Sequence, residues 1–196
     1  MSIKQVYDTT ALLSLSLIGK FDLVRKQGII VSVPISVVEE VVEIAKYKDE
    51  LGEAAKGLLR ITEGAGAAER VEIEQVELKK EYKSLAERIA RFPRVDRGEA
   101  EALALAYQIK AKELVIDDVP AIGSFAGLSK IIDVETVPSS YVLVRAYLND
   151  ALDYDETKML LKELSAKRGW EQSVLYETAI VKTAIVMLEE AKKVKC

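Results

Sequence analysis

The stretch "VYDTTALLSL" (residues 6–15) places a carboxylate between a short apolar strand signal and a leucine-rich helical run. The run before Asp8 predicts a buried strand, and the run after it predicts a helix. Asp8 therefore has two interpretations: it caps the helix, or it binds a cation. The choice depends on which other acids the fold brings to the same place.

Strands and helices alternate along the rest of the chain. Further strands are predicted at residues 29–34, 71–78, 113–118 and 131–137, with helices between them. We expect a long helix from 36 to 60, a break at 63–70, and a single final helix over 171–194. This alternation predicts an α/β fold with a mostly parallel sheet and a helical C-terminal extension.

The length of 196 residues suffices for one domain with its own core. We expect the main unit at residues 1–140, with a helical insertion at about 45–93. The helical extension at 141–196 is expected to pack on the same domain. Charged residues interrupt the longest apolar runs, and the N-terminus turns acidic early, so neither a membrane span nor a signal peptide is predicted. We expect a cytoplasmic protein.

The chain contains no histidine, and its single cysteine is Cys196. These counts exclude Ser-His-Asp and Cys-His catalysis, HExxH zinc sites and thiolate metal cages. Enzyme chemistry would have to rest on carboxylates, lysines, hydroxyls or a bound cofactor. The net charge of -4 gives no general attraction to nucleic acid, so a local patch or metal ions would have to hold such a partner.

Three acids follow predicted strands at their carboxyl ends. Asp8 follows the first strand, and Asp117 and Asp118 follow "ELVI" (113–116). Ligands of open parallel sheets gather beyond these strand ends, where the strand order reverses. If the two strands are neighbours, the three carboxylates meet at one edge of the sheet.

Two helices offer further acids near their first turns. Ser36 with Glu39, and Asp96 with Glu99, have the spacing of a capping box, which explains both glutamates structurally.

Glu40 and Glu101 have no such explanation, and both stand among apolar neighbours. A carboxylate beside a buried helix face is costly unless it is paired or metal-bound, so these two are the preferred site candidates. The alternative places them on a solvated helix face.

Four carboxylates without histidine form a hard, oxygen-rich set suited to Mg²⁺ or Mn²⁺. Such ions relieve repulsion among clustered acids and stabilise charge on a phosphodiester during in-line displacement.

Four motifs in this order resemble the PIN domain, the fold of VapC-type toxin ribonucleases and related nucleases. They are "VYDTTALLSL", "VSVPISVVEEV" (31–41), "DRGEAEALALA" (96–106) and "LVIDD" (114–118), and the resemblance covers roughly residues 4–140. The chain is most similar to a subgroup with a GEAEA signature. The resemblance implies a parallel sheet in the order 3-2-1-4-5.

The resemblance also implies a metal site for Mg²⁺ or Mn²⁺. Matched residue by residue, its ligands and catalytic acids fall on Asp8, Glu40, Glu101 and Asp118, with Asp117 and Glu99 as second choices. Thr9 or Thr10 matches the small hydroxyl residue after the first Asp, which would contact substrate. The basic residue that often follows the Asp pair in the subgroup is absent from "DDVPAIGSFAG" (117–127).

Three functions follow as hypotheses. The first is a metal-dependent ribonuclease that hydrolyses RNA phosphodiesters, as the toxin component of a pair with an antitoxin protein. The second is a catalytically silent PIN-like module that binds RNA or protein. The third is assembly: an apolar stripe on the last helix packs on its own domain or forms the seam of a homodimer, through Val174, Leu175, Thr178, Val181, Ile185 and Leu188.

Overall fold

The computed structural model describes residues 3–63 and 73–195, and its centre is a five-stranded sheet. All strand pairs are parallel, and the order β3-β2-β1-β4-β5 confirms the predicted topology. The strands are β1 (Ile3–Tyr7), β2 (Ile29–Pro34), β3 (Ile73–Val76), β4 (Glu113–Val115) and β5 (Glu135–Val137). The order reverses between β1 and β4, so ligand-binding residues are expected beyond the carboxyl ends of these two strands.

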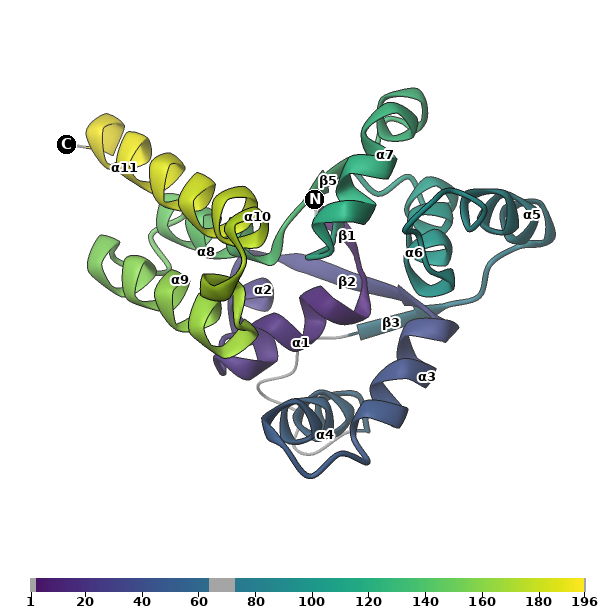
Figure 1. Ribbon diagram of the computed structural model, residues 1–196, viewed down its shortest axis with the longest axis horizontal. Helices are drawn as coiled ribbons and strands as arrows, with labels where there is room; N and C mark the ends of the chain where they lie inside the picture. The colour runs from purple at the N-terminus through teal and green to yellow at the C-terminus, as the bar shows by residue number, and fades with distance from the viewer. Residues whose placement is uncertain (1–2, 64–72, 196) are drawn as a thin grey trace.

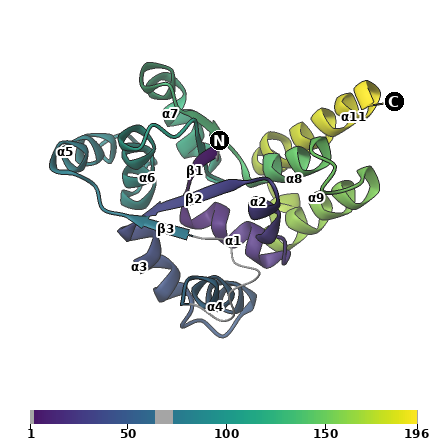
Figure 2. The ribbon, with the colours of Figure 1, turned by 180° about the vertical axis from the view of Figure 1, so that it is seen from behind.

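Helices cover both faces of the sheet (Figures 1 and 2). They are α1 (Thr9–Leu17), α2 (Asp22–Lys26), α3 (Ile35–Ile44), α4 (Glu50–Glu63), α5 (Lys80–Ile89), α6 (Arg97–Gln108), α7 (Val119–Ile132), α8 (Ser139–Leu148), α9 (Tyr154–Arg168), α10 (Val174–Tyr176) and α11 (Thr183–Lys195). A 3₁₀ turn η1 (Trp170–Gln172) and a π-helical segment η2 (Glu177–Lys182) precede and follow α10. Helices α5, α6 and α7 lie on one side, and α1, α2, α8, α9 and α11 on the other.

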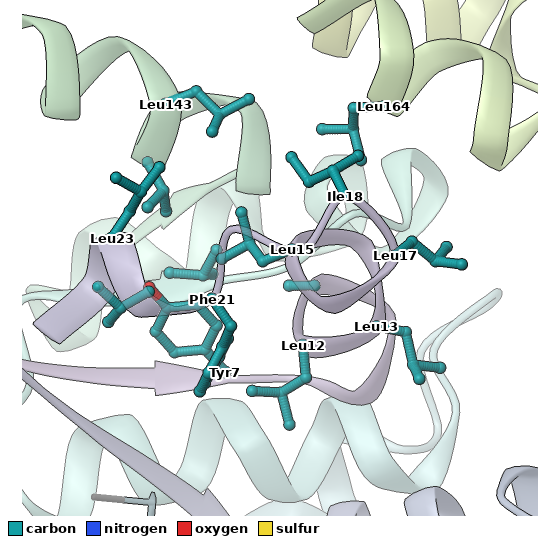
Figure 3. Close-up of a cluster of buried hydrophobic side chains, with 14 of the residues drawn as sticks. Tyr7, Leu12, Leu13, Leu15, Leu17, Ile18, Phe21, Leu23, Leu143 and Leu164 are labelled. Carbon is teal, nitrogen blue, oxygen red and sulfur yellow. The ribbon is translucent and has the colours of Figure 1, made fainter. Parts of the chain in front are cut away.

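Alternating strand residues feed two separate hydrophobic cores. Val6 of β1 packs with α5, α6 and α7, whereas its neighbour Tyr7 packs with α1 and the C-terminal helices. This is the period of two that a sheet covered on both faces requires. Figure 3 shows the second core, where Leu15 of α1, Leu143 of α8 and Leu164 of α9 converge. Residues of the predicted extension thus share a core with the first strand.

The long helix predicted from 36 to 60 is wrong, because the chain breaks between Ile44 and Glu50. Asp49 accepts a hydrogen bond from the backbone N–H of Gly52 (2.8 Å), so it caps α4 instead of continuing α3. A Cβ at Gly52 would collide with the backbone carbonyl of Tyr47, so the close approach at this corner requires glycine. The break predicted at 63–70 lies almost wholly outside the described residues.

The single final helix predicted over 171–194 is also wrong, since η1, α10, η2 and α11 share this region. The apolar stripe divides accordingly: Val181 and Leu188 are buried in the core, whereas Val174 and Leu175 are exposed. The strand predicted at 131–137 is shorter, because α7 continues to Ile132. Within the described chain, no helix is long and apolar enough to cross a membrane.

Candidate metal centre at the carboxyl edge of the sheet

Asp8 lies at the junction of β1 and α1, with 2% of its surface exposed. Its Oδ1 accepts a hydrogen bond from the backbone N–H of Ala11 (2.8 Å), and its Oδ2 accepts one from the hydroxyl of Thr10 (2.6 Å). Asp8 is therefore the N-cap of α1. Capping leaves the Asp8 carboxylate able to bind a cation as well, because each oxygen has a second lone pair.

Glu40 of α3 reaches the same edge of the sheet. Its Oε2 accepts a short hydrogen bond from the hydroxyl of Thr9, at the start of α1. Its Oε1 accepts no hydrogen bond from the described residues. The carboxylate lies against Gly98 of α6, where an added Cβ would stand 2.6 Å from Oε1. The glycine of the "GEAEA" stretch thus leaves room for the carboxylate of Glu40.

Glu99 joins this group from the first turn of α6. The capping box with Asp96 is confirmed: Glu99 Oε2 accepts from the Asp96 N–H (2.9 Å), and Asp96 Oδ1 accepts from the Glu99 N–H (2.8 Å). The side chain is buried, and burial raises the pKa of Glu99 to about 7. The negative charges of Asp96, Asp118 and Glu40 contribute to this raised pKa, against the hydrogen bond from the Asp96 N–H, so Glu99 lies near site acids from two other elements.

Glu101 points to a different side of α6. Two residues along a helix differ by about 200° in direction, so Glu99 and Glu101 leave α6 on different sides, although the negative charge of Glu101 also raises the pKa of Glu40. Glu101 accepts a hydrogen bond from Arg97 Nε (2.7 Å) and lines a cavity of about 550 Å³ between α3, α5 and α6. Geometry therefore favours Glu99 over Glu101, the reverse of the preference drawn from the apolar neighbours.

The two acids after β4 have different surroundings. Asp117 is 1% exposed, and its oxygens accept hydrogen bonds from the backbone N–H (2.8 Å) and the hydroxyl (2.7 Å) of Ser139. It thereby joins the end of β4 to the start of α8. Asp118 is half-buried and caps α7 through the N–H of Ala121 (2.7 Å). The geometry favours Asp118 as the acid that faces a ligand.

Each of the hydroxyls expected to contact substrate donates a hydrogen bond to an acid of this edge. Thr9 is buried and donates to Glu40, as described above. Thr10 donates to Asp8 and accepts from the backbone N–H of Asp117 (3.3 Å), so it bridges β1 and β4. Both threonines orient carboxylates.

The capping box predicted for Ser36 and Glu39 is wrong. Helix α3 begins at Ile35 with Pro34 as its N-cap, so Ser36 is already helical and its side chain makes no cap bond. Strand β2 runs directly into the helix at Pro34, which has the fixed φ that suits this junction. Glu39 is exposed and lines the cavity beside Glu101.

Mutual repulsion and burial characterise this acidic edge. Burial raises the pKa of Asp8 well above its ordinary value, and the negative charges of Asp117 and Glu99 raise it further. The hydrogen bonds from Thr10 and Ala11 act in the opposite direction. Burial also raises the pKa of Glu40, against the hydrogen bond from Thr9. A cation at this edge would favour the ionised forms of Asp8, Glu40 and Glu99.

The donor chemistry of the edge fits Mg²⁺ or Mn²⁺, because every candidate atom is a carboxylate oxygen. As the side chains stand, however, no three acids within residues 3–63 and 73–195 are arranged to hold a metal ion. Their oxygens are engaged with backbone N–H groups and hydroxyls, apart from Oε1 of Glu40 and of Glu99.

One residue at this edge lacked any signal in the sequence. The hydroxyl of Tyr176, from α10, donates a hydrogen bond to Asp118 Oδ2 (3.0 Å). Its position in a helical C-terminal region, 58 residues from Asp118, gave no reason to connect the two.

The fold and the acidic edge together define a three-layer α/β protein with carboxylates gathered at its topological switch point. A family model described as a PIN domain matches residues 4–184, and the chain belongs to this family. The match extends beyond residue 140 into the C-terminal helices. No curated protein and no solved structure matches the chain. PIN domains are generally nucleases that use divalent metals, so the chain has a nuclease-like fold.

Proposed function

We propose that this protein is a Mg²⁺- or Mn²⁺-dependent endoribonuclease. The observation that supports the proposal is that four acids from four elements lie at one edge of the sheet, where Glu99 is within electrostatic range of Asp8, Asp118 and Glu40. Asp8 and Asp118 come from the ends of β1 and β4, and Glu40 and Glu99 from α3 and α6. A fold gains no stability from burying repelling carboxylates, and a cation is the partner that would offset this cost.

In this proposal Asp8, Glu40, Glu99 and Asp118 hold the metal. When bound, a divalent ion activates water and stabilises the charge that develops on a phosphodiester. Thr9 and Thr10 fix the orientation of Glu40 and Asp8 through their hydrogen bonds. With no histidine in the chain, proton transfer would fall to carboxylates or water.

The biological setting forms a finer part of the proposal. We infer a cytoplasmic toxin with an antitoxin partner, on the likeness to VapC-type ribonucleases. The exposed side chains of Val174 and Leu175 support a contact surface for an antitoxin or for a second copy. Light scattering on the wild type and on the double variant Val174→Ser with Leu175→Ser tests whether this surface forms a homodimer. A monomer in both samples would remove the homodimer.

The test of the function is RNA cleavage with Mn²⁺ by the wild type and by a double variant, Asp8→Asn with Asp118→Asn. Both asparagines keep the capping acceptors, so the fold should persist. The matched control is Asp133→Asn with Asp150→Asn, because both positions are exposed and have positive φ, which asparagine tolerates. We expect cleavage in the wild type and control alone. Cleavage that persists in the site variant would contradict the proposal.

A second candidate function has its own observation in favour. The carboxylates already accept hydrogen bonds from hydroxyls and backbone N–H groups, and among the described residues no three acids are arranged to hold an ion. This arrangement suits a catalytically silent PIN-like module that binds RNA or protein. Calorimetry with Mn²⁺ separates the two: absence of binding at millimolar concentrations favours the silent module, whereas binding that Asp8→Asn abolishes favours the nuclease.

A further inference from the structure

The segment that follows α9 brings side chains from the C-terminal region to the acidic edge. The chain leaves α9 through Gly169, whose φ of 66° is left-handed. It then forms η1, α10 and η2, and the π-helical geometry of η2 is of a kind that often occurs at functional sites. Tyr176 stands between α10 and η2 and donates its hydroxyl to Asp118, as described above.

An aromatic stack connects Tyr176 to the end of α9. The ring of Trp170 is buried and stacks on that of Tyr176, with centroids 6.4 Å apart and an interplanar angle of 15°. The guanidinium of Arg168 lies over the Trp170 ring, 5.6 Å from its centroid. The stack thus connects Arg168 to Tyr176, whose hydroxyl donates to a carboxylate of the candidate metal centre.

Arg168 is set apart from other partly buried cations of the protein. Arg145 forms a two-pronged ion pair with Glu113. Arg168 is half-buried, yet among the described residues no acid pairs with it and its buried Nε has no hydrogen-bond partner. A buried charged donor without a partner is costly, which indicates that a ligand supplies the acceptor. Arg168 lies in the last turn of α9, where the helix dipole favours a positive charge. This effect does not provide a hydrogen-bond acceptor for Nε.

The charge of Arg168 acts close to the acidic edge. From the Arg168 guanidinium the stack leads through the rings of Trp170 and Tyr176 to the hydrogen bond between the Tyr176 hydroxyl and Asp118. A planar guanidinium with forked N–H donors suits a phosphate, which it binds through two parallel hydrogen bonds. A phosphate on Arg168 would thus stand near an adjacent phosphate at Asp118 and Glu99.

We propose that Arg168 binds a backbone phosphate of the RNA, next to the phosphate that is cleaved at the acidic edge. This inference rests on the proposed ribonuclease function and adds a substrate-binding residue to it. It also supplies from the C-terminal extension the cation that is missing after Asp117 and Asp118. Tyr176 acts as a positioning residue, because its hydroxyl ties the stack to Asp118.

The test is the binding of a fluorescein-labelled single-stranded oligouridine in EDTA, followed by anisotropy over a series of KCl concentrations. Without metal no hydrolysis occurs, so affinity is measured apart from cleavage. For Arg168→Ala we expect binding weaker by about five- to tenfold and a salt slope smaller by about 0.7, the loss of one phosphate contact on a single strand. Arg168→Lys should restore the slope but not the full affinity, because lysine lacks the fork.

The matched control is Lys162→Ala, which removes one positive charge from an exposed position of the same helix. We expect it to bind RNA with nearly the wild-type slope. Tyr176→Phe keeps the ring and should also keep the slope. Thermal unfolding of each variant identifies a merely structural role: a lower Tm for Arg168→Ala with affinity and slope unchanged would overturn the inference.

The failure of this inference is distinguishable from failure of the proposed function. If the wild type cleaves RNA with Mn²⁺ but Arg168→Ala binds like Lys162→Ala, the inference is overturned and the nuclease remains. If the wild type binds RNA without cleaving it, while Arg168→Ala loses affinity and slope, the phosphate site is supported and the nuclease is not. A wild type that neither binds nor cleaves RNA overturns both.

Discussion

Substitution of Gly98 by alanine perturbs the candidate metal centre without removing a charge or a hydrogen-bonding group. The new Cβ would stand 2.6 Å from Glu40 Oε1 and 3.3 Å from the carboxylate carbon and the other oxygen. Ordinary van der Waals contact begins at 3.4 Å, so the carboxylate has to withdraw by about 0.8 Å. Because Glu40 Oε2 is also bonded to Thr9, this withdrawal disturbs that hydrogen bond as well.

The fold itself should tolerate this change. Gly98 has helical geometry in the first turn of α6, where alanine is favoured over glycine by up to about 1 kcal/mol. The atoms that must move belong to the end of a flexible side chain. Misplacement of a reacting group by about 1 Å costs on the order of 100-fold in rate, and supporting residues of metal sites are worth about 10- to 100-fold in affinity. We therefore expect Gly98→Ala to weaken Mn²⁺ binding and RNA cleavage by at least about tenfold.

Calorimetric titration with Mn²⁺, RNA cleavage and thermal unfolding are measured together on the wild type and two variants. The matched control is Gly123→Ala, since Gly123 is also helical and a Cβ there meets nothing within 4 Å. The control should match the wild type in binding and cleavage. A Gly98→Ala protein with wild-type Mn²⁺ affinity and cleavage would refute the placement of Glu40 in the site.

Three further predictions concern charge. The pKa of Glu99 is raised to about 7, so the metal-free folded protein binds more protons than the unfolded chain between about pH 4.5 and 7. Its free energy of unfolding should therefore fall as pH rises through this window. Urea titrations should show this fall in the wild type and a smaller fall in Glu99→Gln, in which the raised pKa values of Asp8 and Glu40 remain; an equal fall in both would contradict the prediction. The raised pKa of Asp8 means that its ionised form destabilises the metal-free fold at neutral pH. We therefore expect Asp8→Asn to raise the Tm in EDTA and to remove the stabilisation by Mn²⁺. A lower Tm of this variant in EDTA would contradict the prediction. Arg145 and Glu113 form an ion pair whose side chains are 18% and 17% exposed. Arg145→Leu should lower the free energy of unfolding in urea by about 2–4 kcal/mol without changing the Mn²⁺ affinity. A loss below about 1 kcal/mol, the range of exposed pairs, would show that the pair is solvated.

Local patterns predicted the fold well because the periodicity of each strand or helix is visible within a short stretch of sequence. The β-branched run at 29–34 and the leucine-rich run after Asp8 form the strand and helix that their periodicity indicates. The long helices failed where a single capping residue or an irregular turn outweighed the periodicity. Asp49 starts a second helix inside one predicted helix, and the segment from Trp170 to Tyr176 interrupts the other.

The candidate site shows the same division. The strand ends predicted that Asp8, Asp117 and Asp118 lie at one edge of the sheet, because parallel topology fixes where such residues gather. The capping box with Asp96 is readable in the sequence, and for this reason Glu99 was ranked below Glu101 as a candidate ligand. A carboxylate has two oxygens, however, and Glu99 serves the cap with only one of them. The direction of a side chain around a helix depends on what the helix packs against, so the choice between Glu99 and Glu101 needed the tertiary structure.

The sequence by itself determined the alternating α/β pattern, the absence of histidine chemistry, and the carboxylates at the strand ends, since these depend on residue type and local order. Tertiary structure decided which acids lie near one another, why Gly98 must be small, and that Tyr176, stacked on Trp170, hydrogen-bonds to Asp118. These contacts join residues many positions apart along the chain. Local propensity carries no information about such pairs, and only the packing of helices around the finished sheet brings them together.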